Sequence, residues 1–306
     1  MREKIYLVGF LLAAGALLYL GHDLFRGSIL VSWGLSFAGT TTAGVVALTL
    51  YRFKLQLEAS RDELKRKEGE LSFALKVQQA LFPRELPTSG GMEFSAVCIP
   101  ASGVSGDYYD VFELTDGRVV MAIADISGKG ISAAILMANV QALLRVVAGT
   151  CDSPGAVCSK LNTHLHQVTH ADWFATMFYA EWCPNRRLLR YCNAGHHTPY
   201  LSTDSTNRPL DRGGIPLGIL AEYDFETGEV TLQPGDLVIL YSDGITEAGA
   251  RDKGEFGETR LLSLVAASRQ KPLIGIQERV LQEVHAWTGE EVEDDITLVL
   301  ARVSQV

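Results

Sequence analysis

The sequence has little of what builds a disulfide framework or a zinc cluster. Its 306 residues include five cysteines, an odd number, and no two of them are spaced as Cys-x-x-Cys. This pattern argues against both kinds of cysteine structure. Scattered thiols of this kind are typical of a protein in a reducing cytoplasm.

Basic charge is also scarce. Lysine and arginine number 27 against 36 aspartates and glutamates, which gives a net charge of −9. An acidic surface repels phosphate backbones, so nucleic acid is not an expected partner.

Charged side chains are absent from two stretches near the N-terminus, residues 5–20 and 29–51. The second stretch is long enough to cross a hydrocarbon core of about 30 Å at about 1.5 Å per residue. The first has 16 residues, a marginal length unless Gly21 and His22 lie at the membrane interface. The sequence therefore predicts a transmembrane hairpin over residues 1–51, with spans at about 5–21 and 29–51.

The charges that flank these spans predict their orientation. Arg2 and Lys4 precede the first span, and Arg52 and Lys54 follow the second. Cations at both ends of the pair place both ends in the cytoplasm, which predicts a multi-pass protein of the inner (cytoplasmic) membrane. The alternative is a cleaved signal peptide over residues 1–20, but no clear small-x-small cleavage site follows it.

Residues 52–83 have the character of a helical linker. Charges of both signs are mixed, and no proline occurs before Pro83. Leu57, Leu64 and Leu71 recur every seven residues, which predicts a helix with a narrow apolar seam and a weak coiled coil. The alternative is a solvated helix that acts only as a spacer.

The remainder, residues 84–306, alternates short apolar runs with helical patterns. The expected strands are 94–98, 119–126, 174–182, 188–192, 237–241 and 296–303, and the expected helices are 131–147, one beginning at Ser153-Pro154, and others between about 258 and 287. Strands cluster, then helices, then strands again. This order favours an α+β layered fold over repeated βαβ units.

Four segments of this part place an aspartate at a strand edge beside glycine or another acid. They are Ser105-Gly106-Asp107-Tyr108-Tyr109-Asp110, Asp125-Ile126-Ser127-Gly128-Lys129-Gly130, Tyr241-Ser242-Asp243-Gly244 and Glu293-Asp294-Asp295-Ile296-Thr297. Each alone is weak, because an aspartate before glycine commonly marks a turn. Asp125 and Asp243 each follow an apolar strand, however, so their carboxylates should meet at a common edge and repel unless cations neutralise them. Oxygen ligands favour magnesium or manganese over zinc.

Together with two further motifs, these segments resemble a known family. The further motifs are Asn193-Ala194-Gly195-His196-His197 and Gly214-Ile215-Pro216-Leu217-Gly218. The six motifs in this order resemble the PPM metal-dependent protein phosphatases, in the bacterial branch named after stage II sporulation protein E and the phosphatases that regulate alternative sigma factors. The resemblance covers about residues 75–303. It implies two stacked antiparallel β-sheets with helices outside and metals in a cleft at one end.

The resemblance also implies a ligand set for two divalent cations, Mn²⁺ or Mg²⁺. Asp125 would bridge both ions. Asp107 and the backbone carbonyl of Ile126 would hold one of them, and Asp243 and Asp294 the other. Asp125 and Asp243 would then serve catalysis through a metal-activated water that attacks phosphorus in line, so that no protein nucleophile is needed.

Several neighbouring residues have open roles. Asp295 is a second candidate ligand beside Asp294. Ser127 stands where phosphatases outside this branch carry a histidine, which leaves protonation of the leaving oxygen unassigned. Lys129 is either a solvated loop lysine or a phosphate ligand. Adjacent side chains on a strand alternate in direction, so His196 and His197 are interpreted as loop residues that border the cleft.

The sequence thus predicts a membrane-anchored Mn/Mg-dependent serine/threonine protein phosphatase. The resemblance implies a phosphorylated anti-sigma-factor antagonist as its substrate, and a homodimer switched through the linker helix. Two alternatives remain open: a membrane-tethered interaction module without catalysis, and a metal-dependent hydrolase of small phosphate compounds.

Overall fold

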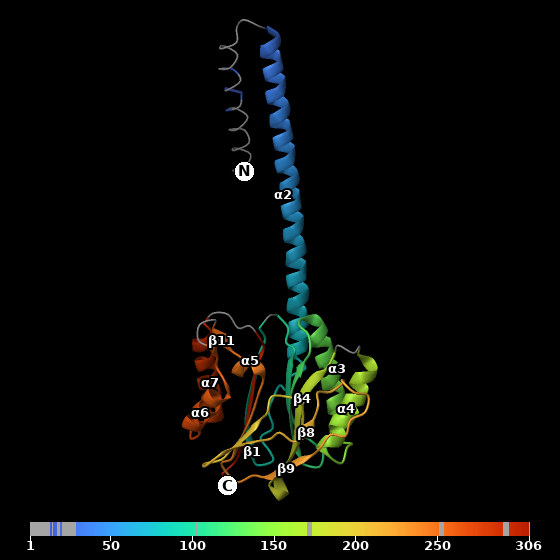
Figure 1. Ribbon diagram of the computed structural model, residues 1–306, viewed down its shortest axis with the longest axis vertical. Helices are drawn as coiled ribbons and strands as arrows, with labels where there is room; N and C mark the ends of the chain where they lie inside the picture. The colour runs from blue at the N-terminus through green and yellow to red at the C-terminus, as the bar shows by residue number, and fades with distance from the viewer. Residues whose placement is uncertain are drawn as a thin grey trace. The chain divides into compact units, whose positions relative to one another are not determined.

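The chain divides into two compact units, residues 1–70 and 71–306, and each is described by itself. The computed structural model in Figure 1 describes residues 29–101, 103–169, 173–250, 254–289 and 294–305, together with Ala13, Gly15, Ala16 and Tyr19.

The long helix α2 (Ile29–Gln79) runs without a break from the predicted second span into the predicted linker. Residues 29–79 contain no proline, a residue that would remove a helical hydrogen bond. By length and composition, α2 could cross a membrane. The sequence predicted two transmembrane helices, whereas the described residues contain one such helix. Most of the predicted first span, about 5–21, lies outside the described residues.

The second unit contains two stacked sheets. The first, sheet A, has the strand order β1-β13-β10-β6-β7. Its strands are β1 (Met92–Ile99), β13 (Ile296–Val303), β10 (Leu237–Tyr241), β6 (Tyr200–Ser202) and β7 (Asn207–Pro209), and all their pairings are antiparallel. The last strand in sequence, β13, therefore lies between β1 and β10.

Sheet B has the order β2-β3-β4-β5-β8, with β9 also paired to β5. Its strands are β2 (Asp107–Glu113), β3 (Val119–Ile126), β4 (Ala175–Cys183), β5 (Leu188–Ala194), β8 (Gly213–Gly214) and β9 (Gly228–Thr231). A short 3₁₀ turn, η1 (Pro184–Arg186), joins β4 to β5. The resemblance implied antiparallel sheets, but β8 pairs with β5 in parallel because a long connection returns the chain beside β5.

Helices cover the outer face of each sheet (Figure 1). Apolar side chains of α3 (Ile131–Val147) and α4 (Pro154–Val168) pack on sheet B, and those of α6 (Glu258–Ser268) and α7 (Leu273–Thr288) pack on sheet A. A third apolar core fills the space between the sheets. Two small elements complete the unit, α5 (Asp243–Thr246) and the hairpin of β11 (Gly249–Ala250) with β12 (Gly254–Glu255).

The predicted α+β sandwich, with helices outside two sheets, is confirmed. Its core strands are apolar on both sides because each lies between two layers: β3 and β10 have almost no exposed side chain. Helix α4 begins as its sequence indicates, with the Ser153 hydroxyl accepting a hydrogen bond from the Ala156 N–H.

Candidate active site

The hairpin of β2 and β3 places two predicted ligands side by side. Asp107 and Asp125 are direct partners in the antiparallel register. Asp107 is only 2% exposed, and its Oδ2 accepts a hydrogen bond of 2.6 Å from the Thr297 hydroxyl. Gly106 permits this close approach, since a Cβ there would lie 3.2 Å from the Ile126 carbonyl oxygen.

A short turn at the end of sheet A holds the other predicted ligands. The Ser242 N–H donates to the Thr297 carbonyl at 3.0 Å, and the Thr297 N–H donates to the Ser242 hydroxyl at 3.0 Å. Gly244 packs directly on the residues that precede β13: a Cβ there would lie 2.0 Å from the Asp295 carbonyl oxygen. The first residue of α5, Asp243, is thereby fixed beside the 294–295 turn.

The adjacent acids Asp294 and Asp295 have different surroundings. The carboxylate of Asp295 accepts three hydrogen bonds of 2.7 to 2.8 Å from residues 101–106, two from backbone N–H groups and one from the Ser105 hydroxyl. Asp294 is exposed, and its Oδ2 lies 3.8 Å from the Lys129 ammonium nitrogen. Asp295 thus ties sheet A to the loop before β2, whereas Asp294 has a carboxylate available to the cleft.

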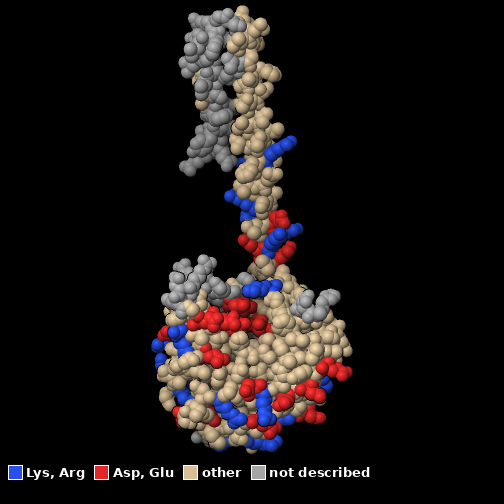
Figure 2. Space-filling view, viewed as in Figure 1, with Lys and Arg blue, Asp and Glu red and all other residues tan. Residues whose placement is uncertain are grey.

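Three of these acids, Asp125, Asp294 and Asp295, line a small hollow between the ends of the two sheets. A cavity of about 30 Å³ there is lined by Ala101, Val104, Gly106, Asp125, Gly128, Lys129, Gly130, Asp294 and Asp295. Figure 2 shows acidic side chains gathered around one hollow of the domain surface. The hollow has room for one or two atoms of the size of water or a small cation.

Burial and neighbouring negative charge both raise the pKa values of the acids around the hollow. Burial raises the pKa of Asp107 well above its ordinary value, and the charge of Asp125 adds to this effect. Burial, together with the charges of Asp243, Asp294 and Asp295, raises the pKa of Asp125 to about 6. Carboxylates that resist ionisation in one another's presence are stabilised by bound cations. The oxygen-rich donor set fits divalent cations such as Mg²⁺ or Mn²⁺.

Comparison with known proteins identifies the family. The family described as Stage II sporulation protein E (SpoIIE) matches residues 115–304, more than half of the chain. The chain belongs to the SpoIIE family. It is also 31% identical over 258 residues to the phosphoserine phosphatase RsbU of Bacillus subtilis, a match that covers 82% of this chain and 74% of RsbU. The predicted family and its phosphatase class are therefore confirmed.

Solved structures show the same fold. The SiaA-PP2C domain of Pseudomonas aeruginosa superimposes with a TM-score of 0.70 at 22% identity, covering 79% of this chain and 99% of that domain. RsbX, solved in complex with magnesium, superimposes with a TM-score of 0.55 at 17% identity, covering 72% of this chain and 99% of RsbX. Divalent metal ions are the cofactors of PP2C-type phosphatases, to which the SpoIIE family belongs.

One group near the SpoIIE-family cleft was missed by the sequence analysis. One ligand atom each of His197, Asp243 and Glu247 lie within 4.8 Å of one another. The available signal was the spacing: Glu247 follows Asp243 by four residues, which places both on one face of a helical turn. The neighbouring His196 is buried, with its Nδ1 2.8 Å from the Thr176 hydroxyl.

The motifs at residues 193–197 and 214–218, which contain no acids, form the turn that carries these histidines. The Asn193 amide accepts from the His196 N–H at 2.7 Å and donates to the His196 carbonyl at 3.0 Å. Gly195 has a φ of 69°, and a Cβ there would lie 2.5 Å from Pro216 Cδ. The Asn-Ala-Gly motif and the Gly-Ile-Pro motif are therefore packed against each other.

The last turn of α2, which belongs to the second unit, is hydrogen-bonded to the loop beside the acids. The buried Gln78 amide donates to the Ser105 carbonyl at 2.7 Å and accepts from the Ser105 N–H at 2.9 Å. Because the Ser105 hydroxyl donates to Asp295, Gln78 is two hydrogen-bonded steps from the cleft.

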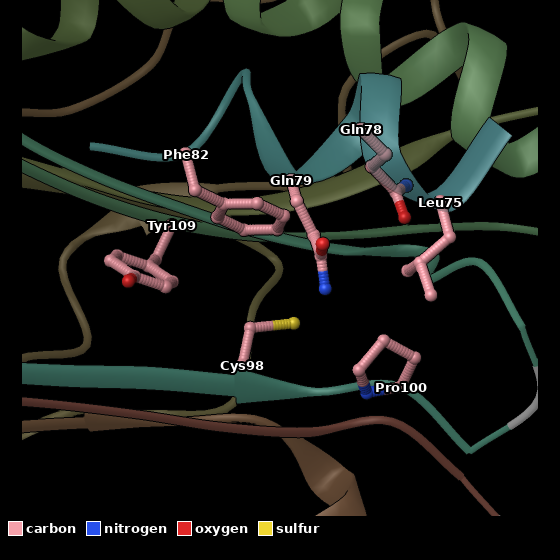
Figure 3. Close-up of a pocket in the computed structure, with 7 residues that line it drawn as sticks. All are labelled: Leu75, Gln78, Gln79, Phe82, Cys98, Pro100 and Tyr109. Atoms are coloured by element: carbon pink, nitrogen blue, oxygen red, sulfur yellow. The ribbon is translucent and has the colours of Figure 1, made fainter. Parts of the chain in front are cut away.

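A pocket of about 170 Å³ lies beside this contact, and Figure 3 shows the seven residues that line it. Phe82 and Tyr109 form one side, with ring centroids 5.2 Å apart, and Leu75 and Pro100 lie on the other. The end of α2 is thus packed less tightly against the sheets than the core is.

Proposed function

We propose that this chain is a membrane-anchored, Mn²⁺- or Mg²⁺-dependent protein phosphatase that hydrolyses phosphoserine or phosphothreonine. The observation that carries the proposal is the gathering of aspartates from two sheets around Asp125. Asp125 and Asp294 line one hollow, Asp107 is the strand partner of Asp125, and the charge of Asp243 acts on Asp125. Two divalent cations would relieve this repulsion. The proposed ligands are Asp107, Asp125, the Ile126 carbonyl, Asp243 and Asp294.

The surroundings of the two neighbouring acids support Asp294 over Asp295 as the ligand. Asp295 already accepts three hydrogen bonds from the 101–106 loop, whereas Asp294 has an exposed carboxylate. We therefore assign Asp295 a positioning role: it holds the loop that carries Gly106 close to Asp125.

The chain's own residues would orient the reaction. Divalent cations in this hollow would supply Lewis-acid chemistry, lowering the pKa of water and offsetting charge on the phosphoryl oxygens. Thr297 fixes the rotamer of Asp107, and the Ser242 turn fixes Asp243, so the carboxylates are pre-organised before substrate binds. Lys129 stands at the rim, where its ammonium group adds positive charge beside Asp294.

The proposed substrate is a phosphorylated anti-sigma-factor antagonist. This proposal is supported by the similarity to RsbU, named as a phosphoserine phosphatase. The purified full-length chain should release phosphate from such a protein in the presence of Mn²⁺. This release should stop when a chelator is added. Nucleotides and sugar phosphates, tested in parallel, separate a protein phosphatase from a hydrolase of small phosphate compounds. Metal-independent turnover, or none on any substrate, would refute the proposal.

Membrane anchoring is supported by the apolar N-terminal part of α2, whose side chains are exposed. The chain should resist alkaline extraction from membranes, and a reporter fused after Val306 should be cytoplasmic. Release by alkaline carbonate, or a mature N-terminus near residue 22, would contradict the anchor.

Dimerisation through the linker is a further part of the proposal. Leu57, Leu64 and Leu71 are exposed along α2 and would form the seam. Such a seam is weak, but a membrane raises the effective concentration of two chains. Replacing Leu64 and Leu71 with glutamine should reduce crosslinking between cysteines placed along the seam and should change the phosphatase rate. If neither quantity changes, the helix is only a spacer.

A further inference from the structure

One lysine stands at the edge of the acidic hollow. Among the described residues that line the hollow, Lys129 is the only cation. Its ammonium nitrogen lies 3.8 Å from Asp294 Oδ2, on the sheet A side. Burial and the neighbouring acids raise the pKa of Asp125, on the sheet B side, and the charge of Lys129 counteracts this rise. Lys129 therefore acts electrostatically on acids from both sheets.

The loop that carries Lys129 is anchored at its base and open at its tip. At the base, the Ser127 N–H donates to the Phe174 carbonyl and the Phe174 N–H donates to the Ser127 hydroxyl, both at 2.9 Å. At the tip, Lys129 is flanked by Gly128 with a φ of 100° and Gly130 with a φ of 72°, values that favour glycine. A Cβ on either glycine would meet nothing within 4 Å. The loop is thus fixed beside the hollow, while the space on both sides of Lys129 is open.

The ion pair between Lys129 and Asp294 is loose. Its distance of 3.8 Å exceeds that of a hydrogen bond, and the two side chains are 78% and 56% exposed. An exposed pair of this kind contributes little to stability, because water and salt screen it. Lys129 can therefore leave Asp294 at small cost, and its flexible stem lets the ammonium group reach other groups around the hollow.

Asp294 ceases to be a favourable partner for Lys129 when it serves as a metal ligand. Two divalent cations carry as much positive charge as the four aspartates proposed to bind them carry negative charge. The ammonium group of Lys129 would then be repelled by the cations and would no longer be needed by the carboxylate. A phosphoserine side chain brings a charge of about −1.5 to −2 at pH 7, together with strong acceptor oxygens. It supplies the anion that the loaded hollow would withhold from Lys129.

We propose that Lys129 exchanges partners in the catalytic cycle: it pairs with Asp294 while the hollow holds no cation, and it binds a phosphoryl oxygen of the substrate once the hollow is loaded. The proposal rests on the phosphatase function proposed above. An ammonium group has three donors on a compact charge, which suits it to phosphate. Lys129 thus competes with cations for Asp294 and assists the binding of the phosphoserine.

These two roles have opposite signs. Removing the charge of Lys129 should strengthen Mn²⁺ binding and weaken phosphate binding. A residue that only supports the loop would weaken both when it is replaced, and a solvated lysine without a partner in the reaction would change neither. The pair of measurements therefore separates the proposed exchange from both of these alternatives.

The experiment uses the full-length chain in nanodiscs of zwitterionic lipid, which do not concentrate Mn²⁺. Lys129→Met removes the charge and keeps an unbranched side chain, and Lys129→Arg keeps the charge. Lys271→Met is the matched control, because Lys271 is an exposed lysine between α6 and α7 and does not line the hollow. Calorimetry at low ionic strength measures Mn²⁺ binding to the metal-free protein, and then the binding of inorganic phosphate to the Mn²⁺-loaded protein.

For Lys129→Met we expect the Mn²⁺ concentration at half-saturation to fall about fivefold, because a unit charge about 4 Å from Asp294 is lost in a solvated setting. The dissociation constant of phosphate should rise about tenfold, because a hydrogen bond from a charged group is lost. Lys129→Arg should lie closer to wild type than Lys129→Met in both quantities. Lys271→Met should match wild type in both.

Mn²⁺ binding that does not tighten in Lys129→Met, or phosphate binding that does not weaken, would overturn the exchange. So would a Lys129→Arg protein that behaves as Lys129→Met does, since positive charge would then not be the cause. Failure of the wild-type chain to bind Mn²⁺ would overturn this proposal together with the proposed function. Phosphate release from the phosphoprotein is measured separately: its absence in wild type would refute the proposed function, whereas the two binding measurements decide the role of Lys129.

Discussion

The two halves of the acidic cleft are built differently. The sheet B half, Asp107 and Asp125, lies within or at the end of strands and is mostly buried. The sheet A half, Asp243 and Asp294, follows β10 or precedes β13 in short turns and is more exposed. The buried half carries most of the electrostatic strain, because burial is the first cause of the raised pKa values of Asp107 and Asp125.

This contrast predicts unequal effects of removing one charge from each half. Asp125→Asn, in the buried half, should lower phosphatase activity more than about 100-fold, since loss of a group that only supports a ligand already costs about 10- to 100-fold. Asp294→Asn, in the exposed half, should lose less phosphatase activity, and high Mn²⁺ should restore part of that activity. Steady-state rates over a Mn²⁺ titration measure both, with the exposed Asp211→Asn as control. Equal losses without recovery would remove the distinction between the halves.

A second change tests how firmly the exposed half is held. Gly244→Ala would place a methyl group against the Asp295 carbonyl, and we expect a loss of about 3 kcal/mol in the free energy of unfolding. Gly275→Ala in α7 is the control, because a Cβ there meets only Lys271 Cβ at 3.9 Å and alanine favours a helix. Urea unfolding gives both values. A Gly244→Ala protein as stable as wild type would show that the turn yields easily.

The buried half of the cleft should make the folding stability of the metal-free protein depend on pH. Because the pKa of Asp125 rises from 3.8 to about 6 on folding, its contribution to stability is present below pH 3.8 and lost as the pH rises to about 6. This difference corresponds to about 3 kcal/mol. Thermal unfolding in chelator should show stability falling over this range, less so in Asp125→Asn, and Mn²⁺ should restore it at pH 7. If the stability of wild type and of Asp125→Asn changed with pH in the same way, Asp125 would not be the origin of the pH dependence.

The smallest expected effect concerns the loop that joins the halves. Gln78→Leu removes both hydrogen bonds to Ser105, and we expect activity to fall several-fold with weaker Mn²⁺ affinity. Gln79→Leu is a close control: it is the adjacent residue, it also lines the pocket of Figure 3, and it is exposed. If the two variants behave alike, the Gln78 contact does not position the cleft.

Much of the fold could be predicted because its signals are local. Buried strands such as β3 and β10 are unbroken apolar runs, and α3 follows the helical period over the predicted residues. Asp125 and Asp243 could be singled out because each stands where an apolar run gives way to a turn. Strand β8 could not be predicted. Its two glycines carry no strand pattern, and their pairing depends on the chain that returns beside β5.

The finer features of the site depend on contacts between distant segments. The sequence alone does not distinguish the roles of Asp294 and Asp295. What distinguishes them is that the 101–106 loop, about 190 residues away, donates hydrogen bonds to Asp295. Gln78 reads as one polar residue on an exposed helix, yet it is buried against Ser105. Such pairings are set by tertiary packing, which neither periodicity nor composition encodes.

The place of β13 in sheet A bears on when the enzyme can first act. This strand pairs with both β1 and β10, and the acids of the exposed half directly precede it. During synthesis the ribosome has made all the other strands before β13 emerges, so β1 and β10 must wait for the partner between them. A nascent chain can form the β2–β3 hairpin early, but the second half of its cleft appears only when the last strand is inserted. Catalysis is therefore withheld until translation of the domain is finished.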